Sequence, residues 1–152
     1  MTDDKLVNRL ADFWAQEIPM TRALGVAVDA WDGKTLVLGA ALAANKNDKG
    51  TAFGGSLYSL AVLAGWGLVM LSLWRDGYDC DVVIQHASVD YLSPVRTRLV
   101  ATCCVDEPAV WQAFRRQLDQ RGKARLLLQP TVAGDNNPAL RMSANFVASV
   151  RA

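Results

Sequence analysis

The segment Leu57–Trp74 constrains the fold more than any other part of this 152-residue chain. It is apolar almost without interruption, so a helix built from it has no polar face to present to water. Its length is that of a marginal membrane span. Because it contains Tyr58, Ser59 and two glycines, and because no basic cluster flanks it, we interpret it as a core helix and expect no membrane insertion.

The composition is typical of one globular domain, which we expect to span residues 1–152: 51% of the residues are apolar and the net charge is +1. A net charge near zero gives no argument for nucleic acid as a partner. Three cysteines and a single histidine exclude a disulfide framework and make a structural zinc site improbable. We therefore expect reduced thiols, a cytoplasmic location, no metal and no cofactor. The acidic, amphipathic N-terminus resembles neither a signal nor a transit peptide.

Hydrophobic periodicity predicts three helices and six strands. The predicted helices are one capped by Thr2 and ended by Pro19, the apolar helix ending near Arg75–Gly77, and one from Glu107 to Gly122; the predicted strands are 24–31, 35–42, 81–92, 97–105, 124–133 and 139–150. An antiparallel sheet of about six strands, bent around the apolar helix, would bury that helix completely. The sequence therefore predicts an α+β fold.

A loop rich in special residues, "NKNDKGTAFGGS" (45–56), runs directly into the apolar helix. A helix N-terminus exposes unpaired N–H groups and carries a partial positive charge. Gly54 and Gly55 would let a carbonyl group approach these donors closely, and such donors stabilise the oxyanion of acyl transfer. The alternative is a plain turn in which Ser56 or Thr51 caps the helix.

Two motifs, one in this loop and one after the apolar helix, resemble those of a known family. The pattern NxxGxxFGG (47–55) resembles the NxxGxxHGG of hot-dog thioesterases, and "DYLSPV" (90–95) resembles a segment that follows the helix in that superfamily. More narrowly, "NKNDKGTAFGGSL" followed by "LAGWGL" resembles the thioesterase domains of the YiiD C-terminal type. The resemblance implies a hot-dog fold, a homodimer or dimer of dimers, and hydrolysis of an acyl-CoA or acyl-carrier-protein thioester.

The resemblance also implies roles for single residues. The loop amide of the family corresponds to Asn47 and the carbonyl-polarising N–H to Gly54. The family's helix carboxylate falls on Val62, and its histidine falls on Phe53, so the expected acid or base is missing. Further substrate contacts are expected from the same loop and the first helical turns: Asn45, Thr51, Phe53, Gly55, Ser56 and Ser59. Loop hydrogen bonding is the alternative role for both asparagines.

His86 and Asp90 are the candidates to replace the missing carboxylate. Strict alternation along strand 81–92 places them on one face with Val82 and Ile84. A histidine is a natural general base near neutral pH, and in a dimer either side chain could reach the other subunit's pocket. A partly buried structural histidine is the competing interpretation, and a water oriented by Asn47 and a hydroxyl group is a third possibility.

A group of basic residues near the third helix suggests a polyanionic partner: Arg115, Arg116, Arg121, Lys123 and Arg125. They suit coenzyme A phosphates or an acidic carrier protein, although a solvated helix face would look the same. The leading hypothesis is thus a thioesterase. The valine at position 62 favours a non-catalytic acyl-thioester or carrier-protein binding module as the alternative, and a dehydratase using His86 and Asp90 ranks below both.

Overall fold

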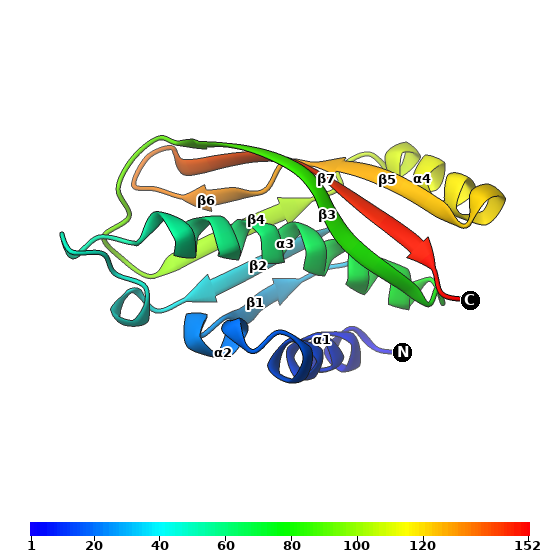
Figure 1. Ribbon diagram of the computed structural model, residues 1–152, viewed down its shortest axis with the longest axis horizontal. Helices are drawn as coiled ribbons and strands as arrows, with labels where there is room; N and C mark the ends of the chain where they lie inside the picture. Colours follow the sequence, from blue (N-terminus) through cyan, green and yellow to red (C-terminus); the bar gives the residue numbers. More distant parts are fainter.

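A long helix lies at the centre of the molecule and a seven-stranded antiparallel sheet curves around it (Figure 1). The computed structural model describes residues 1–152. Its elements are α1 (Asp3–Glu17), α2 (Met20–Leu24), β1 (Ala27–Trp31), β2 (Thr35–Ala40), the short 3₁₀ helix η1 (Leu42–Ala44), α3 (Gly54–Arg75), β3 (Cys80–Tyr91), β4 (Leu99–Cys104), α4 (Pro108–Arg121), β5 (Lys123–Leu128), β6 (Thr131–Ala133) and β7 (Pro138–Val150). The strand order is β1-β2-β4-β6-β7-β3, with β5 also paired to β7.

The central helix α3 is a core helix, as its composition predicts. It is long and apolar enough to cross a membrane, but 72% of its most apolar window is buried inside the chain. Gly65 and Gly67 explain how the sheet and α1 approach it so closely. A Cβ at Gly65 would lie 2.6 Å from the Phe146 ring, and one at Gly67 would lie 3.0 Å from the Trp14 ring. Both distances are below normal contact, so these positions need glycine.

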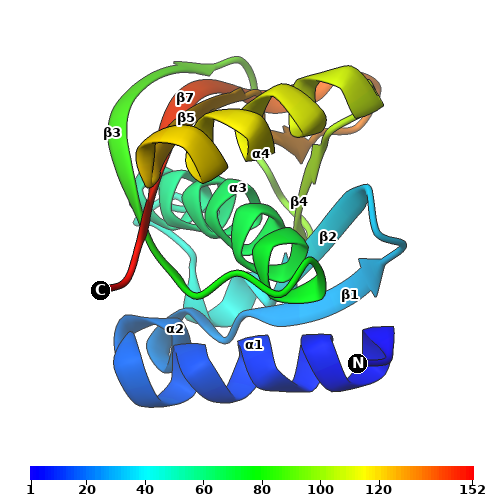
Figure 2. The same cartoon turned by 90° about the vertical axis from the view of Figure 1, so that its right-hand side faces the viewer.

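Helices α1 and α4 lie on opposite sides of α3 (Figure 2). Helix α1 packs against α3 and β1, and it buries Leu6, Leu10 and Trp14 as its periodicity predicts. Helix α4 packs mainly against β5 and buries Phe114 and Leu118. Burial of these apolar side chains away from water drives the packing of both helices on the sheet.

Three of the predicted strands have different bounds in the structure. The predicted strand 124–133 is two strands, because Pro130 lacks the N–H that a continuous ladder needs, so the sheet has seven strands. The predicted strand 24–31 begins only at Ala27. Before it lies α2, which ends at Gly25 with a left-handed φ of 71°. The predicted strand 35–42 stops at Ala40, where η1 follows.

A β-bulge in β3 changes which side chains face the core. The register against β7 shifts between Ile84 and His86, so Gln85 is the extra residue. Before the bulge Val82 and Ile84 face inward, and after it Ala87 and Val89 do. The predicted shared face of Val82, Ile84, His86 and Asp90 is therefore wrong, since alternation was assumed to run without interruption. His86 and Asp90 do stay on one face, which is the outer face of the sheet.

Candidate functional site

The loop before α3 is anchored by Asn45, which is only 4% exposed. Its side-chain N–H₂ group donates to the carbonyl oxygens of Leu24 and Ala41, both at 2.8 Å. Its own backbone carbonyl accepts a bond from the Phe53 N–H at 2.7 Å. Asn45 therefore ties both ends of the loop to the end of α2, and its amide donors are used within the chain.

Asn47 organises the loop's tip. Its Oδ1 accepts from the backbone N–H groups of Lys49 and Thr51, and its Nδ2 donates to the Thr51 hydroxyl at 2.9 Å. The backbone repeats this pairing, because the Asn47 N–H donates to the Thr51 carbonyl at 2.7 Å. Both oxygen lone pairs of the amide are thus engaged, and one N–H of its NH₂ group remains for another acceptor.

The first turn of α3 offers backbone donors, as the sequence predicts for a helix start. Phe53 is the N-cap residue, and no side chain caps the helix. The N–H groups of Gly54 and Gly55 have no acceptor within the chain. They lie at the positive end of a 22-residue helix dipole. The capping roles considered for Thr51 and Ser56 do not occur in the structure.

A hollow of about 310 Å³ lies beside these donors, between α2 and the start of α3. Its lining residues are Met20, Ala23, Leu24, Ala44, Asn45, Phe53, Gly55, Ser56 and Ser59. The hollow has an apolar wall from α2 and two hydroxyl groups from α3, but no ionisable side chain. Phe53 lies at the edge of the hollow and is 56% exposed. A Cβ at Gly55 would overlap the Phe53 ring, so glycine is required for this arrangement of the entrance.

Tyr91 is a site residue that the sequence did not reveal. Its hydroxyl donates to the Gly54 carbonyl oxygen at 3.1 Å, and its ring would contact a Cβ at Gly54 at 3.3 Å. The bulge at Gln85 places Tyr91 on the helix-facing side of β3. Uninterrupted alternation along the strand does not predict this contact, because the apolar positions change phase at the bulge, from 82 and 84 before Gln85 to 87, 89 and 91 after it.

His86 and Asp90 lie away from the hollow of their own chain. Both are exposed on the outer face of β3, where His86 is paired across the strands with Asn145 and Asp90 with Arg141. Val62, at the family's carboxylate position, is half-buried on α3. Within one chain, therefore, no carboxylate or imidazole lines the hollow at the start of α3.

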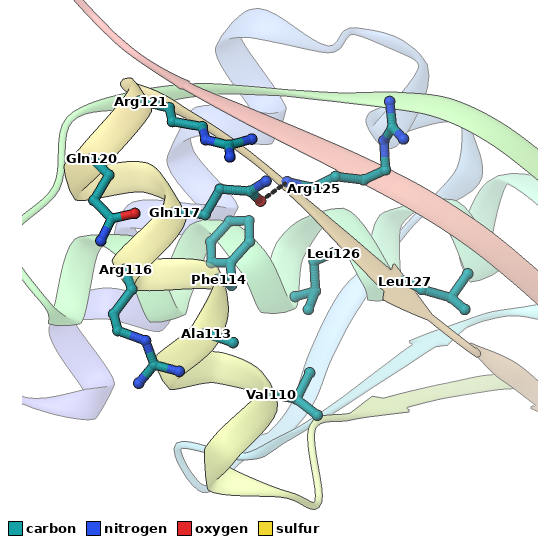
Figure 3. Close-up of a pocket in the computed structure, with 10 residues that line it drawn as sticks. All are labelled: Val110, Ala113, Phe114, Arg116, Gln117, Gln120, Arg121, Arg125, Leu126 and Leu127. Atoms are coloured by element: carbon teal, nitrogen blue, oxygen red, sulfur yellow. Dashed lines mark hydrogen bonds between the residues drawn. The ribbon is translucent and has the colours of Figure 1, made fainter.

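The basic residues divide into two groups. Arg115 forms an ion pair with Asp76, with 3.4 Å between its Nη1 and the Asp76 Oδ2. The other four line two hollows that share Gln117, Arg121 and Arg125 between α4 and β5, and none of them has an ion-pair partner: Arg116, Arg121, Lys123 and Arg125. Figure 3 shows the first of these hollows, with Arg116, Arg121 and Arg125. Gln117 connects α4 to β5, because its side-chain oxygen Oε1 accepts a hydrogen bond from the backbone N–H of Arg125 at 3.2 Å. This groove lies toward the C-terminal end of α3, far from Gly54 (Figure 1).

Known proteins share the whole architecture. Residues 7–150 match the family model described as "Putative thioesterase (yiiD_Cterm)". A crystal structure of a protein of unknown function from Chlorobaculum tepidum is 30% identical, covers 99% of this chain and 98% of its own, and superposes with a TM-score of 0.95. A "putative thioesterase" from Shewanella oneidensis is also 30% identical, with coverage of 97% and 99% and a TM-score of 0.86.

More distant structures share the fold alone. A thioesterase from Haemophilus influenzae is 15% identical, with coverage of 95% and 90% and a TM-score of 0.72. The bent sheet around one helix is the hot-dog fold that the loop motif implied. The family match extends over nearly all of the chain, so the resemblance is confirmed: this protein belongs to the YiiD C-terminal family of hot-dog thioesterases.

Proposed function

We propose that this protein hydrolyses an acyl-CoA or acyl-carrier-protein thioester at the first turn of α3. One observation carries the proposal: the Gly54 and Gly55 N–H groups have no acceptor in the chain, and Phe53 and Gly55, on either side of Gly54, line a hollow. Water adds to the thioester carbon, the carbonyl oxygen becomes an oxyanion, and the carbon–sulfur bond then breaks to release the thiol and the acid. Donors fixed before the reaction stabilise that oxyanion most effectively.

The surrounding residues have supporting roles in this proposal. Ser56 and Ser59 place hydroxyl groups in the hollow, where they can orient the acyl group or the attacking water. Asn45 has an indirect role: its side-chain NH₂ group donates to the carbonyl oxygens of Leu24 and Ala41 and so holds the loop in position. Asn47 and Thr51 hold the tip of the same loop, and the free N–H of Asn47 is available to the substrate. Phe53 forms the entrance.

A second copy of the chain would supply the missing acid or base. The twelve residues of β3 form an edge of the sheet, and Val83 on it is 58% exposed. A long edge strand with an exposed apolar side chain favours pairing with another strand. Pairing of two β3 edges would bring His86 or Asp90 of one copy toward the other, as a homodimer or within a dimer of dimers.

The carrier and the cellular location are part of the proposal. All three cysteines are unpaired, which suits a reducing cytoplasm. The four cations between α4 and β5 complement a phosphate-rich or acidic carrier. However, α3 is about 33 Å long at 1.5 Å per residue. A carrier bound in this groove would therefore serve the thioester site of another subunit better than that of its own chain.

A non-catalytic binding module is the second candidate, because Val62 stands where the family has a carboxylate and the hollow contains no ionisable group. The two functions are separated by mixing purified protein with acetyl-, octanoyl- and palmitoyl-CoA and with the same acyl groups on a carrier protein. Chromatography then measures the CoA or carrier protein that is released with a free thiol, so the protein's own cysteines do not contribute to the signal. Turnover supports the thioesterase, and binding without turnover supports the module. Absence of both would contradict both proposals.

A further inference from the structure

A second cavity lies near the opposite end of α3 from the thioester site. It has a volume of about 330 Å³, which is within the range of small-molecule sites. The C-terminal turns of α3, the β1–β2 turn, the end of β4 and the first turns of α4 all contribute to its wall. Leu68, Val105 and Trp111 supply apolar surface, so the cavity can hold a small organic body as well as polar groups.

The charge of this cavity is positive. Lys34, Arg75 and Arg115 line it, and Asp76 is its only carboxylate. Asp76 is already engaged: it accepts from the Trp111 Nε1–H at 2.8 Å and pairs with Arg75 at 3.2 Å and with Arg115 at 3.4 Å. Asp76 thus fixes both guanidinium groups at the wall, and it is the one carboxylate among three cations in the lining; Asp32 near Lys34 and Asp119 near Arg115 lie outside the lining. The excess positive charge favours an anionic ligand.

Two polar groups of the wall lack partners. Ser72 is 5% exposed, lines the cavity, and its hydroxyl makes no hydrogen bond within the chain. The Nε–H of Arg115 is buried and also has no acceptor. Buried polar groups are nearly always hydrogen-bonded, so the unpartnered Nε–H of Arg115 indicates an acceptor from outside the chain, and the Ser72 hydroxyl on the same wall is free to donate to it. Ser72 is also the one buried polar residue of an otherwise apolar helix, where alanine would be the better helix former.

We propose that this cavity is a binding site for a small organic anion. The oxygens of its carboxylate or phosphate group accept from Ser72, Arg115 and Lys34, and its apolar body packs on Leu68 and Trp111. The site shares no residue with the hollow beside Gly55. The proposal therefore goes beyond thioester hydrolysis and does not depend on it.

Three probes with the same ring test the ligand chemistry: benzoate, phenyl phosphate and the neutral benzyl alcohol. Amide and indole NMR shifts of the intact protein are recorded during titration. We expect the two anions to shift the Ser72 amide and the Trp111 indole N–H in a saturable manner, and the alcohol to leave them unchanged. Benzoate alone would identify a carboxylate ligand, and phenyl phosphate alone a phosphate ligand; either supports the site. No saturable shift with either anion, or equal shifts with the alcohol, would overturn it.

Matched variants test the residues. Lys34→Gln removes one exposed charge from the cavity, and Arg116→Gln removes one from the separate α4–β5 groove, so the net charge changes equally. We expect about fivefold weaker anion binding for Lys34→Gln and for Ser72→Ala, the size of one lost hydrogen bond, and no change for Arg116→Gln. Ser72→Ala should keep or raise the melting temperature, because its hydroxyl has no partner to lose. Equal weakening by Arg116→Gln, or full affinity in Ser72→Ala, would contradict the proposal.

Discussion

The hydroxyl of Tyr91 donates a hydrogen bond to the carbonyl oxygen of Gly54 at 3.1 Å. This bond joins the last residue of the edge strand β3 to the first residue of the central helix α3. The N–H of Gly54 belongs to the proposed oxyanion site, so Tyr91 holds the residue that carries it. The position of a backbone donor relative to the substrate strongly affects the rate that it can support.

Tyr91→Phe is predicted to lower kcat by several-fold with little change in stability. The hydrogen bond is exposed and contributes less than about 1 kcal/mol to folding, but its loss lets the start of α3 shift relative to β3. Tyr78→Phe is the control, because the Tyr78 hydroxyl bonds Asp119, which lies on α4 at the other end of the molecule. Steady-state kinetics and thermal melts of both variants check this. An equal loss of activity in the two variants would contradict the assigned role.

Asn45→Ala is predicted to destabilise the fold by about 2–3 kcal/mol, because two carbonyl groups that it bonds at a buried site lose their donor. Asn47→Ala should cost about 1 kcal/mol, since its bonds lie in a half-exposed loop and water can replace them. Urea denaturation of the two variants gives this comparison. A more stable Asn45→Ala than Asn47→Ala would show that the loop is not anchored through Asn45.

The central element of the fold could be predicted because its signal is local. The run Leu57–Trp74 has no polar face, and only a surrounding sheet can bury it. Hydrophobic periodicity alone predicts one strand over 124–133, whereas Pro130, which lacks an N–H, indicates the division into two. A single uninterrupted alternation predicts the strand faces only up to the bulge at Gln85; beyond it the apolar positions change phase, from 82 and 84 to 87, 89 and 91, and the pairing with β7 places the extra residue there.

The candidate site was predictable in part for the same reason. Unpaired N–H groups follow from any helix start, so Gly54 and Gly55 could be predicted from the chain alone. The partners of Asn45 depend on Leu24, which lies 21 residues earlier, and the position of Tyr91 depends on the bulge. Such long-range contacts are set by the tertiary structure and not by local sequence.

Gly65→Ala is predicted to destabilise the protein by about 1–2 kcal/mol. The new methyl group would lie 2.6 Å from the fully buried Phe146 ring, and this overlap outweighs the gain of about 1 kcal/mol in helix propensity. Gly54→Ala in the same helix is the control, because its Cβ would meet only the exposed ring of Tyr91 at 3.3 Å. Chemical denaturation distinguishes the two, and equal stability of both variants would show that the contact with Phe146 relaxes easily.

Cys103 is predicted to resist alkylation until the protein unfolds. Burial away from water, together with the neighbouring Cys104, raises the pKa of the Cys103 thiol to about 12. Its thiolate fraction at pH 8 is then on the order of 10⁻⁴. Labelling with iodoacetamide followed by mass spectrometry should modify the half-exposed Cys104 first. Early modification of Cys103 would contradict its burial.

The same thiol links stability to pH. The unfolded chain ionises Cys103 near pH 9, whereas the folded chain keeps it neutral up to about pH 12. The contribution of the neutral Cys103 thiol to the free energy of unfolding is therefore fully present below pH 9, and it is lost as the pH rises from 9 toward 12. In Cys103→Ala this contribution to the pH dependence should disappear. Identical alkaline profiles of the two proteins would contradict the raised pKa.

Replacement of a single amide hydrogen tests the proposed thioesterase site most directly. Gly54 is the first residue of α3, a position that accepts proline, and Phe53 before it has the extended conformation that proline requires (φ −64°, ψ 132°). Gly54→Pro therefore removes the N–H while keeping the helix, and Gly54→Ala adds a Cβ but keeps the N–H. We predict that kcat for the best thioester substrate falls at least about 100-fold in Gly54→Pro and less than about threefold in Gly54→Ala, at equal melting temperatures. Equal kcat values in the two variants would contradict a role for this N–H in catalysis.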